Sequence, residues 1–267
     1  MKLSIITVNL NNKVGLQKTI DSVISQSSNE YEWIVIDGGS KDGSKELIGE
    51  HADFISYWVS ESDSGIYEAM NKGINAAKGD YLQFLNSGDI LADDNIVSDF
   101  NNQNFQKDVV YGNALIVDHE GIEVGFFNAP LEIRMSFFFN HALNHQATFF
   151  SKRCFERFRY NEQNKIASDL ELYMLLLYNN FSFQKYNRTI VCFDNTGISS
   201  INTGENEFKG IVERILPKGI RADYEDFISF RDVDLAIMIK QIIKSHRIVR
   251  HITRLFLYPL YWISKKC

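Results

Sequence analysis

Proline, cysteine and long hydrophobic runs are all scarce in this sequence. The 267 residues include three prolines and three cysteines, and no segment approaches the ~20 consecutive apolar residues of a membrane-spanning helix. Cys154, Cys192 and Cys267 do not have the spacing of a metal site, so we expect buried thiols in a reducing compartment. The apolar start of the chain is short and runs into asparagines, which argues against a signal peptide. With 45% hydrophobic residues, the chain is expected to form one globular domain with a C-terminal appendage.

Glycine is missing from the first predicted strand-to-helix turn, residues 7–12. Its absence there excludes the GxGxxG fingerprint of dinucleotide-binding proteins. The segment GGSKDGSK, residues 38–45, nearly imitates a P-loop, but Ser44 stands where a lysine must follow the second glycine. Neither a nicotinamide enzyme nor a P-loop NTPase fits the sequence.

Acidic residues are missing from the end of the chain. Residues 240–267 contain seven lysines and arginines and no acid, whereas the rest of the chain has 21 basic against 34 acidic residues. An acidic body argues against nucleic-acid binding. At ~100° per residue the basic side chains share one stripe of a helix; they are Lys240, Lys244, Arg247, Arg250 and Arg254. Such basic, aromatic-rich segments are typical of helices on anionic membrane surfaces, although a helix packed on the body would give the same pattern.

Strand and helix patterns alternate over the first hundred residues. Leu3–Val8 and Trp33–Ile36 are apolar runs typical of buried parallel strands, and a third strand is expected near residues 54–60. Between the first two strands lies a helical apolar stripe over residues 16–24, which Asn11 and Asn12 can cap. This alternation predicts an α/β fold with a doubly wound, mostly parallel sheet.

The stretch from Glu61 to Asp89 carries the most information. Its helix begins near Ile66 and stops at Gly79, and Tyr81–Leu85 is a run of strand length. The polar loop Asn86–Asp89 follows at the carboxyl end of that strand, where open α/β sheets bind their ligands.

The second half of the chain is less regular. Residues 109–118 and 123–128 are expected to pair as antiparallel strands, and residues 147–150 to form another short strand. A helix is predicted over residues 168–178, with acids in its first turn, and a turn at residues 194–197. The remainder is expected to be helical.

Polar side chains recur at the predicted strand ends. They are Thr7, Asn9, Asp37, Asp63 and Asp89. Any one of them could be a simple loop cap, but neighbouring strand ends in an open sheet build one crevice. Together they predict a binding site.

Five motifs resemble family 2 glycosyltransferases of the GT-A fold. They are SIITVNLNN (4–12), EWIVIDGGSKDGS (32–44), ESDSGIYEAMNKGINAAKGDYLQFLNSGD (61–89), NHQATFF (144–150) and ASDLEL (167–172), in the order of the family. The run from Asp63 is most similar to bacterial glycosyltransferases of colanic acid, capsule and O-antigen assembly. The resemblance implies a nucleotide-sugar donor half over residues 1–100, an acceptor and catalytic half over 101–205, and a helical C-terminal region over 206–267.

The resemblance also implies the roles of individual residues. Contacts to the uracil and ribose of a UDP-sugar, and the rest of the nucleotide pocket, would come from Thr7, Asn9, Asp37, Asp63, Tyr67, Asn71, Lys72 and Asn86. The DXD motif of the family falls at Asn86–Asp89, and its metal ligand is Asp89. Gly88 stands where many relatives carry another acid, so we expect weaker metal binding but retained function.

The chemistry of sugar transfer explains why such residues are needed. Displacement of UDP builds charge on the departing diphosphate, which Mn²⁺ or Mg²⁺ neutralises with one or two protein carboxylates. An inverting transfer also needs a base for the acceptor hydroxyl, and the resemblance assigns this role to Asp169. Glu171 lies roughly 200° further around a helix, so both acids cannot face one substrate. His145 and Gln146 would line the acceptor side, and residues 193–200 resemble a loop of the family near the donor phosphates.

These observations predict an inverting, metal-dependent hexosyltransferase. The hexose, glucose or galactose by preference, would pass from a UDP-sugar to a lipid-pyrophosphate-linked saccharide of O-antigen or capsule. Residues 240–267 would hold the enzyme on the cytoplasmic face of the bacterial inner membrane. The alternative is a non-catalytic nucleotide-sugar binding or assembly protein. Hydrolysis of the UDP-sugar has no recognisable signature, and the sequence does not predict an oligomeric state.

Overall fold

The computed structural model describes residues 2–118, 120–139, 141–195 and 205–223 of the chain. Contacts divide the chain into two units, Met1–Ile215 and Leu216–Cys267. The predicted basic segment 240–267 lies outside the described residues, and so does most of the predicted loop 193–200. In the described part, no helix has the length and hydrophobicity needed to cross a membrane.

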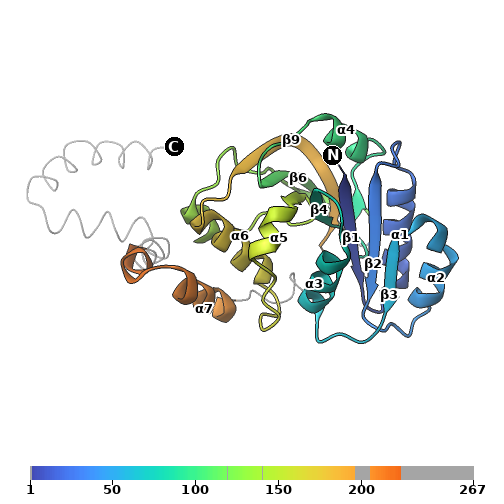
Figure 1. Cartoon of the computed structure of the whole chain (residues 1–267), viewed down its shortest axis with the longest axis horizontal. Coiled ribbons are helices and arrows are strands. Elements are labelled where there is room, and N and C mark those ends of the chain that lie inside the picture. Colours follow the sequence, from blue (N-terminus) through green and yellow to red (C-terminus); the bar gives the residue numbers. More distant parts are fainter. Residues whose placement is uncertain (1, 119, 140, 196–204, 224–267) are drawn as a thin grey trace, which may run out of the picture. The chain divides into compact units, whose positions relative to one another are not determined.

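One mixed sheet organises the first unit (Figure 1). Its strands follow the order β3-β2-β1-β4-β8-β6-β9-β5, and β7 pairs with β6. The strands are β1 (Leu3–Asn9), β2 (Tyr31–Asp37), β3 (Tyr57–Ser60), β4 (Tyr81–Phe84), β5 (Ile90–Leu91), β6 (Val109–Val117), β7 (Glu123–Phe127), β8 (Thr148–Ser151) and β9 (Phe183–Asp194). The helices are α1 (Lys13–Ile24), α2 (Ser44–Glu50), α3 (Ile66–Ala76), α4 (Ile96–Asn102), α5 (Lys152–Arg157), α6 (Ser168–Tyr178) and α7 (Glu205–Ile215).

Strands β3, β2, β1 and β4 are parallel and form the predicted doubly wound half. Alternate residues of β1 serve the two faces. Ile5 belongs to a core cluster with Leu16 and Ile20 of α1, whereas Ile6 meets α3 at Gly73. A Cβ on Gly73 would lie 2.4 Å from Cγ2 of Ile6, so only glycine permits this close approach of helix and strand.

The parallel register aligns the polar strand ends. Asn9 at the end of β1 pairs with Asp37 at the end of β2, and Asp37 pairs with Ser60 at the end of β3. Asn9 and Asp37 therefore lie side by side at one edge of the sheet, as the sequence predicts, and Ser60 lies next to Asp37.

The predicted antiparallel addition is also present. Strand β8 lies between β4 and β6 and is antiparallel to both, and β7 forms a hairpin with β6. The predicted strand at residues 147–150 is β8, shifted by one residue, and the predicted helix at 168–178 is α6. The third strand begins at Tyr57, because Ala52–Phe54 forms a turn of 3-10 helix instead.

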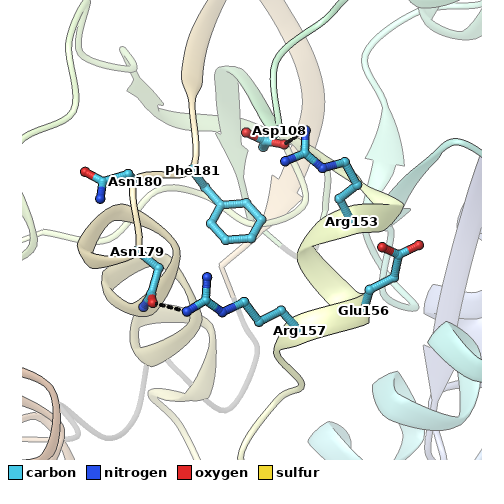
Figure 2. A pocket seen from close by; sticks show the side chains of 7 residues that line it. All are labelled: Asp108, Arg153, Glu156, Arg157, Asn179, Asn180 and Phe181. Atoms are coloured by element: carbon cyan, nitrogen blue, oxygen red, sulfur yellow. Dashed lines mark hydrogen bonds and ion pairs between the residues drawn. The ribbon is translucent and has the colours of Figure 1, made fainter.

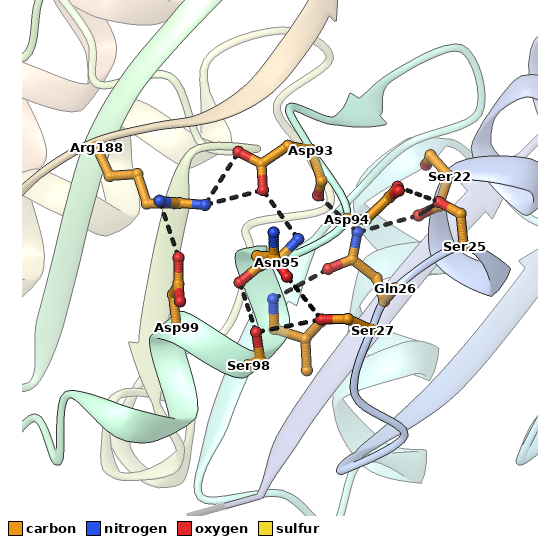
Figure 3. A network of polar contacts seen from close by, with 11 residues as sticks. Ser22, Ser25, Gln26, Ser27, Asp93, Asp94, Asn95, Ser98, Asp99 and Arg188 are labelled. Atoms are coloured by element: carbon orange, nitrogen blue, oxygen red, sulfur yellow. Dashed lines mark hydrogen bonds and ion pairs between the residues drawn. The ribbon is translucent and has the colours of Figure 1, made fainter.

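The long strand β9 is absent from the prediction. It is parallel to β6 and antiparallel to β5, and it ends at Asp194, where a turn is expected from the sequence. Polar contacts hold β9 in place: Arg188 of β9 pairs with Asp93 before α4 and with Asp99 in α4 (Figure 3). Gln26 and Ser27, which follow α1, form hydrogen bonds with Asp93 and Asn95 of the same loop. Because polar contacts help to hold β9 in place, its sequence does not show the regular apolar alternation by which a strand is normally recognised.

Candidate active site

The first wall of the site lies at the ends of β1 and β2. Asp37 is fully buried and accepts hydrogen bonds from Asn9 Nδ2 (2.7 Å), Ser60 Oγ (2.7 Å) and the backbone N–H of Ser40 (3.0 Å). Burial alone would raise the pKa of Asp37, but hydrogen bonds from Ser40, Ser60 and Asn9 outweigh it and lower the pKa. Asp37 is therefore a fixed anion at the head of the crevice.

Asp63 approaches this wall from the segment after β3. A Cβ on Gly38 would lie 2.7 Å from Oδ2 of Asp63, so the missing side chain at Gly38 makes room for the carboxylate. Asp63 accepts the backbone N–H of Gly65 over 3.1 Å, and burial raises its pKa. The structure thus brings Asn9, Asp37 and Asp63 together, as the sequence predicts.

Thr7 and Asn71 are placed differently from the prediction. Thr7 has no exposed surface, and its hydroxyl accepts a hydrogen bond from Trp33 Nε1 over 3.0 Å. Asn71 clamps the backbone of Tyr160, donating to its carbonyl (2.9 Å) and accepting from its N–H (3.1 Å). Because their polar groups are engaged inside the fold, this geometry does not support the predicted contacts of these two side chains with a nucleotide.

Tyr67 and Lys72, the other predicted residues of α3, are also held by protein groups. The Tyr67 hydroxyl donates to the carbonyl of Ile166 over 2.5 Å. The Lys72 ammonium pairs with Glu61 (2.9 Å) and Glu68 (3.1 Å) and stays partly exposed. Tyr67 therefore links α3 to the segment before α6.

The loop Asn86–Asp89 ends on a buried carboxylate. Asp89 Oδ2 accepts from Gln146 Nε2, and Oδ1 accepts from the backbone N–H of Asp194, each over 3.0 Å. Burial raises the pKa of Asp89 to about 7, because no neighbour offsets the full cost of removing its charge from water. A cation bound beside Asp89 would favour the ionised form.

Asp194 is the site residue that the sequence analysis missed. Gly88 has φ +108°, and a Cβ on it would lie 3.6 Å from Oδ2 of Asp194. The Asp194 carboxylate thus lies next to the place where the DXD pattern expects an acid side chain. Recognising Asp194 from sequence would have required the strand β9 that delivers it, and β9 lacks a regular apolar pattern.

Asp169 and the Asn86 loop meet through one imidazole ring. His145 Nδ1 lies 3.6 Å from Asp169 Oδ2, and His145 Nε2 lies 3.3 Å from Asn86 Nδ2. His145 and Gln146 are adjacent at the start of β8, so one holds the predicted base and the other holds Asp89. Both predicted residues therefore lie in the site.

Glu171 has a structural environment. It is buried and accepts two hydrogen bonds from Arg214 Nη2, each over 3.0 Å, and others from Asn161 and Asn164. Of the two acids in the first turn of α6, only Asp169 therefore borders the crevice.

The donor set at Asn86–Asp89 suits a hard divalent cation. It offers carboxylates from Asp89 and Asp194 and the amide oxygen of Asn86, whose Oδ1 is buried without a partner in the described part of the chain. Among the described residues, no group of three or more His, Cys, Asp or Glu side chains forms a metal site. One or two carboxylates suffice where the phosphates of a substrate complete the coordination, as is usual for Mg²⁺.

A second pocket of about 390 Å³ lies elsewhere, between α5 and the end of α6 (Figure 2). In it Arg153 pairs with Asp108 (3.2 Å) and Arg157 donates to Asn179 (2.7 Å) around the ring of Phe181. Its lining comes from Asp108, from α5 and from residues 179–181, whereas His145 and Gln146 precede β8. None of the predicted site residues lines it.

The chain is similar to known glycosyltransferases in sequence. The sequence model of glycosyl transferase family 2 matches residues 4–169. An uncharacterized glycosyltransferase of Mycobacterium tuberculosis is 42% identical over 97 residues, which are 36% of this chain and 37% of that relative. The PGL/p-HBAD biosynthesis glycosyltransferase of Mycobacterium bovis is 25% identical over 222 residues, 80% of each chain. The chain thus matches about a third of the first relative and most of the second.

Solved structures show the same fold. Staphylococcus aureus TarS in complex with UDP-GlcNAc gives a TM-score of 0.66 at 15% identity, over 80% of this chain and 65% of that one. The mannosyltransferase PcManGT from Pyrobaculum calidifontis, in complex with GDP-Man and Mn²⁺, gives a TM-score of 0.55 at 13% identity, over 73% of this chain and 57% of that one. The fold is therefore of the GT-A type.

Proposed function

The chain belongs to glycosyl transferase family 2, and on that premise we propose that it is an inverting, metal-dependent hexosyltransferase. The donor is a UDP-sugar, with glucose or galactose favoured. The acceptor is a hydroxyl of a lipid-pyrophosphate-linked saccharide in O-antigen or capsule assembly. The observation that carries the proposal is the contact chain from Asp169 through His145 to Asn86, which joins the base to the metal loop.

The donor end is supported by the group around Asp37. Asn9, Asp37 and Asp63 offer an amide and two carboxylates at the carboxyl edge of the sheet, where α/β folds bind nucleotides. TarS has the same fold and was solved with UDP-GlcNAc. Carboxylates accept hydrogen bonds from ribose hydroxyls and from the N–H of uracil. Asp63, which is partly exposed, would contact the nucleoside, and the buried Asn9 and Asp37 would form the wall behind it.

The metal loop would hold the diphosphate. Mn²⁺ or Mg²⁺ would be bound by the carboxylates of Asp89 and Asp194 and by the amide oxygen of Asn86. PcManGT was solved in complex with GDP-Man and Mn²⁺. When bound, the ion neutralises charge on the leaving UDP. The hydrogen bond from Gln146 Nε2 would keep the Asp89 carboxylate oriented for the ion.

Asp169 would take the proton of the acceptor. The acceptor oxygen forms a bond to the anomeric carbon, the bond from that carbon to the β-phosphate oxygen breaks, and its electron pair leaves with UDP. The hydroxyl proton passes to a carboxylate oxygen of Asp169, whose side chain is 19% exposed at the crevice. Attack opposite the leaving group inverts the anomeric centre, so an α-linked donor yields a β-linked product.

The acceptor and the location of the protein form the second part of the proposal. A basic, amphipathic segment at 240–267 fits an enzyme that works on lipid-linked saccharides at the cytoplasmic face of the inner membrane. One relative, the PGL/p-HBAD biosynthesis glycosyltransferase of M. bovis, is likewise named as a biosynthetic glycosyltransferase. The sequence resemblance to O-antigen and capsule enzymes supports a bacterial acceptor of this class.

A non-catalytic nucleotide-sugar binding protein is the competing function, because Gly88 lacks the expected acid. A donor panel distinguishes the two. We expect acceptor-dependent release of UDP from UDP-glucose or UDP-galactose in the presence of Mn²⁺ or Mg²⁺, and none in EDTA. Metal-independent binding of UDP with no turnover on any acceptor would instead establish the binding protein.

A further inference from the structure

Helix α6 begins without a capping side chain of its own. Its N-cap position is Ala167, which has no side chain that can accept a hydrogen bond. The first N–H groups of a helix have no partner within the helix, and a missing cap costs ~1 kcal/mol on average. This matters here because Asp169 lies in that first turn.

The segment that leads into α6 is held by a side chain from another helix. Glu207 of α7 accepts the backbone N–H groups of three consecutive residues: Lys165 (2.6 Å), Ile166 (3.0 Å) and Ala167 (2.9 Å). Burial would raise the pKa of Glu207, but these three backbone hydrogen bonds outweigh it and lower the pKa, so the carboxylate stays ionised. A charged acceptor on three N–H groups is a strong restraint on a short segment.

Helix α7 also contacts α6 on the C-terminal side of Asp169. Arg214 lies seven residues after Glu207, which is two turns of helix, so both side chains leave the same face of α7. Arg214 holds Glu171, one of the first residues of α6, through bonds of 3.0 and 3.1 Å to Oε1. The two contacts of α7 therefore bracket Asp169, one on each side in sequence.

The segment before α6 is held from α3 as well. The Tyr67 hydroxyl donates to the carbonyl of Ile166, while the N–H of the same residue goes to Glu207. Both backbone groups of Ile166 are thus fixed by side chains from distant parts of the chain. These contacts fix the segment that leads to Asp169 from two distant parts of the chain.

We propose that Glu207 is a positioning residue for the catalytic base, acting by fixing residues 165–167 at the entry of α6 and so holding Asp169 beside His145. The inference rests on the proposed function, because it takes Asp169 as the base. Loss of the acceptor frees three N–H groups two to four residues before Asp169 and loosens the segment that enters α6. A base displaced by ~1 Å can lose ~10²-fold in rate. Among the described hydrogen bonds of Asn9, Asp37 and Asp63 none goes to Glu207, so we expect donor binding to be unchanged.

The test compares Glu207→Ala and Glu207→Gln with Glu213→Ala, an exposed acid on the same helix. Each variant is made in the full chain, alone and combined with Asp169→Asn. We expect Glu207→Ala to lower kcat by about 10- to 100-fold with KM for the UDP-sugar unchanged. Glu207→Gln, which keeps one acceptor oxygen, is expected to lose less, and Glu213→Ala nothing. Independently of the activity assay, the rate of backbone hydrogen exchange at residues 165–169 should rise in Glu207→Ala.

The combination with Asp169→Asn separates positioning from general stability. If Glu207 acts through Asp169, the residual rate of Asp169→Asn does not fall further when Glu207→Ala is added. A further fall as large as in the wild-type background would overturn the inference, as would an unchanged kcat in Glu207→Ala with faster exchange. If Asp169→Asn itself retains turnover, the base assignment of the proposed function fails instead, which is a different result.

Discussion

The backbone N–H of Asp194 donates a hydrogen bond to Oδ1 of Asp89 over 3.0 Å, across 105 positions of sequence. This bond ties the end of β9 to the loop after β4. It also places the Asp194 carboxylate 3.6 Å from where a Cβ on Gly88 would lie. The acid that the DXD pattern lacks at Gly88 is therefore matched in space by an acid from another strand.

Asp194→Asn is expected to weaken metal binding. The variant keeps the backbone bond to Asp89 but removes one carboxylate, so the affinity for Mn²⁺ in the presence of UDP should fall by about tenfold or more. Titration calorimetry with Mn²⁺ and UDP measures this directly. The matched control is Asp53→Asn, an exposed acid in the 3-10 turn that precedes β3. Equal Mn²⁺ affinities for the two variants would remove Asp194 from the metal site.

Asp89 makes stability depend on pH in the absence of metal. Its pKa is about 7 in the folded protein against 3.8 for a free aspartate, so between these values the folded state binds more protons than the unfolded state. Stability contributed by the protonated form is therefore lost as the pH rises from about 4 to about 7. The Asp89→Asn variant has no carboxyl group at this position, so its stability should not show this decrease with pH.

Urea unfolding at pH 5 and pH 8 in EDTA tests this dependence. The wild-type free energy of unfolding should decrease relative to that of Asp89→Asn between the two pH values, by about 3 kcal/mol at most. Parallel pH dependences of the two proteins would show that Asp89 titrates normally.

Arg188 should contribute modestly to stability. It bridges Asp93 (2.8 Å) and Asp99 (2.9 Å), but these side chains are partly exposed, so water and salt weaken the pairs (Figure 3). We expect Arg188→Gln to lower the free energy of unfolding by about 1 kcal/mol. Arg159→Gln is the control, since its guanidinium bonds to the carbonyl of neighbouring Phe158. An equal loss in both variants would mean that the network adds nothing.

The basic segment gives a prediction about membranes. A chain ending at residue 239 is expected to lose flotation with vesicles of anionic lipid, because all seven Lys/Arg of residues 240–267 are removed. The full-length protein should float with anionic vesicles, less so at high salt, and not with neutral ones. Unchanged flotation of the shortened chain would place the membrane contact elsewhere or exclude it.

The parallel half of the fold can be predicted from the sequence because its strands and helices follow one another along the chain as short, distinct segments. Leu3–Val8 and Tyr81–Leu85 are apolar runs with clear ends, and the acid or amide that follows each strand falls at a predictable edge. The structure accordingly brings Asn9, Asp37 and Asp63 together. The fold class follows from the same pattern.

Contacts between distant segments could not be read in this way. Asn71 lies in a motif of the family, yet its amide serves the backbone of Tyr160, a partner that no spacing reveals. Thr7 lies at a strand end but points into the core toward Trp33. Asp194 and Glu207 act through β9 and α7, whose positions depend on tertiary polar contacts rather than on periodicity.

The role of Asp169 as the base is tested by comparing turnover with donor binding. Acceptor-dependent UDP release from the preferred UDP-sugar is compared for the wild type and Asp169→Asn, with UDP affinity measured alongside in the presence of Mn²⁺. We predict that turnover falls by at least about 10²-fold while UDP binds with unchanged affinity. Near-normal turnover in Asp169→Asn would contradict the account.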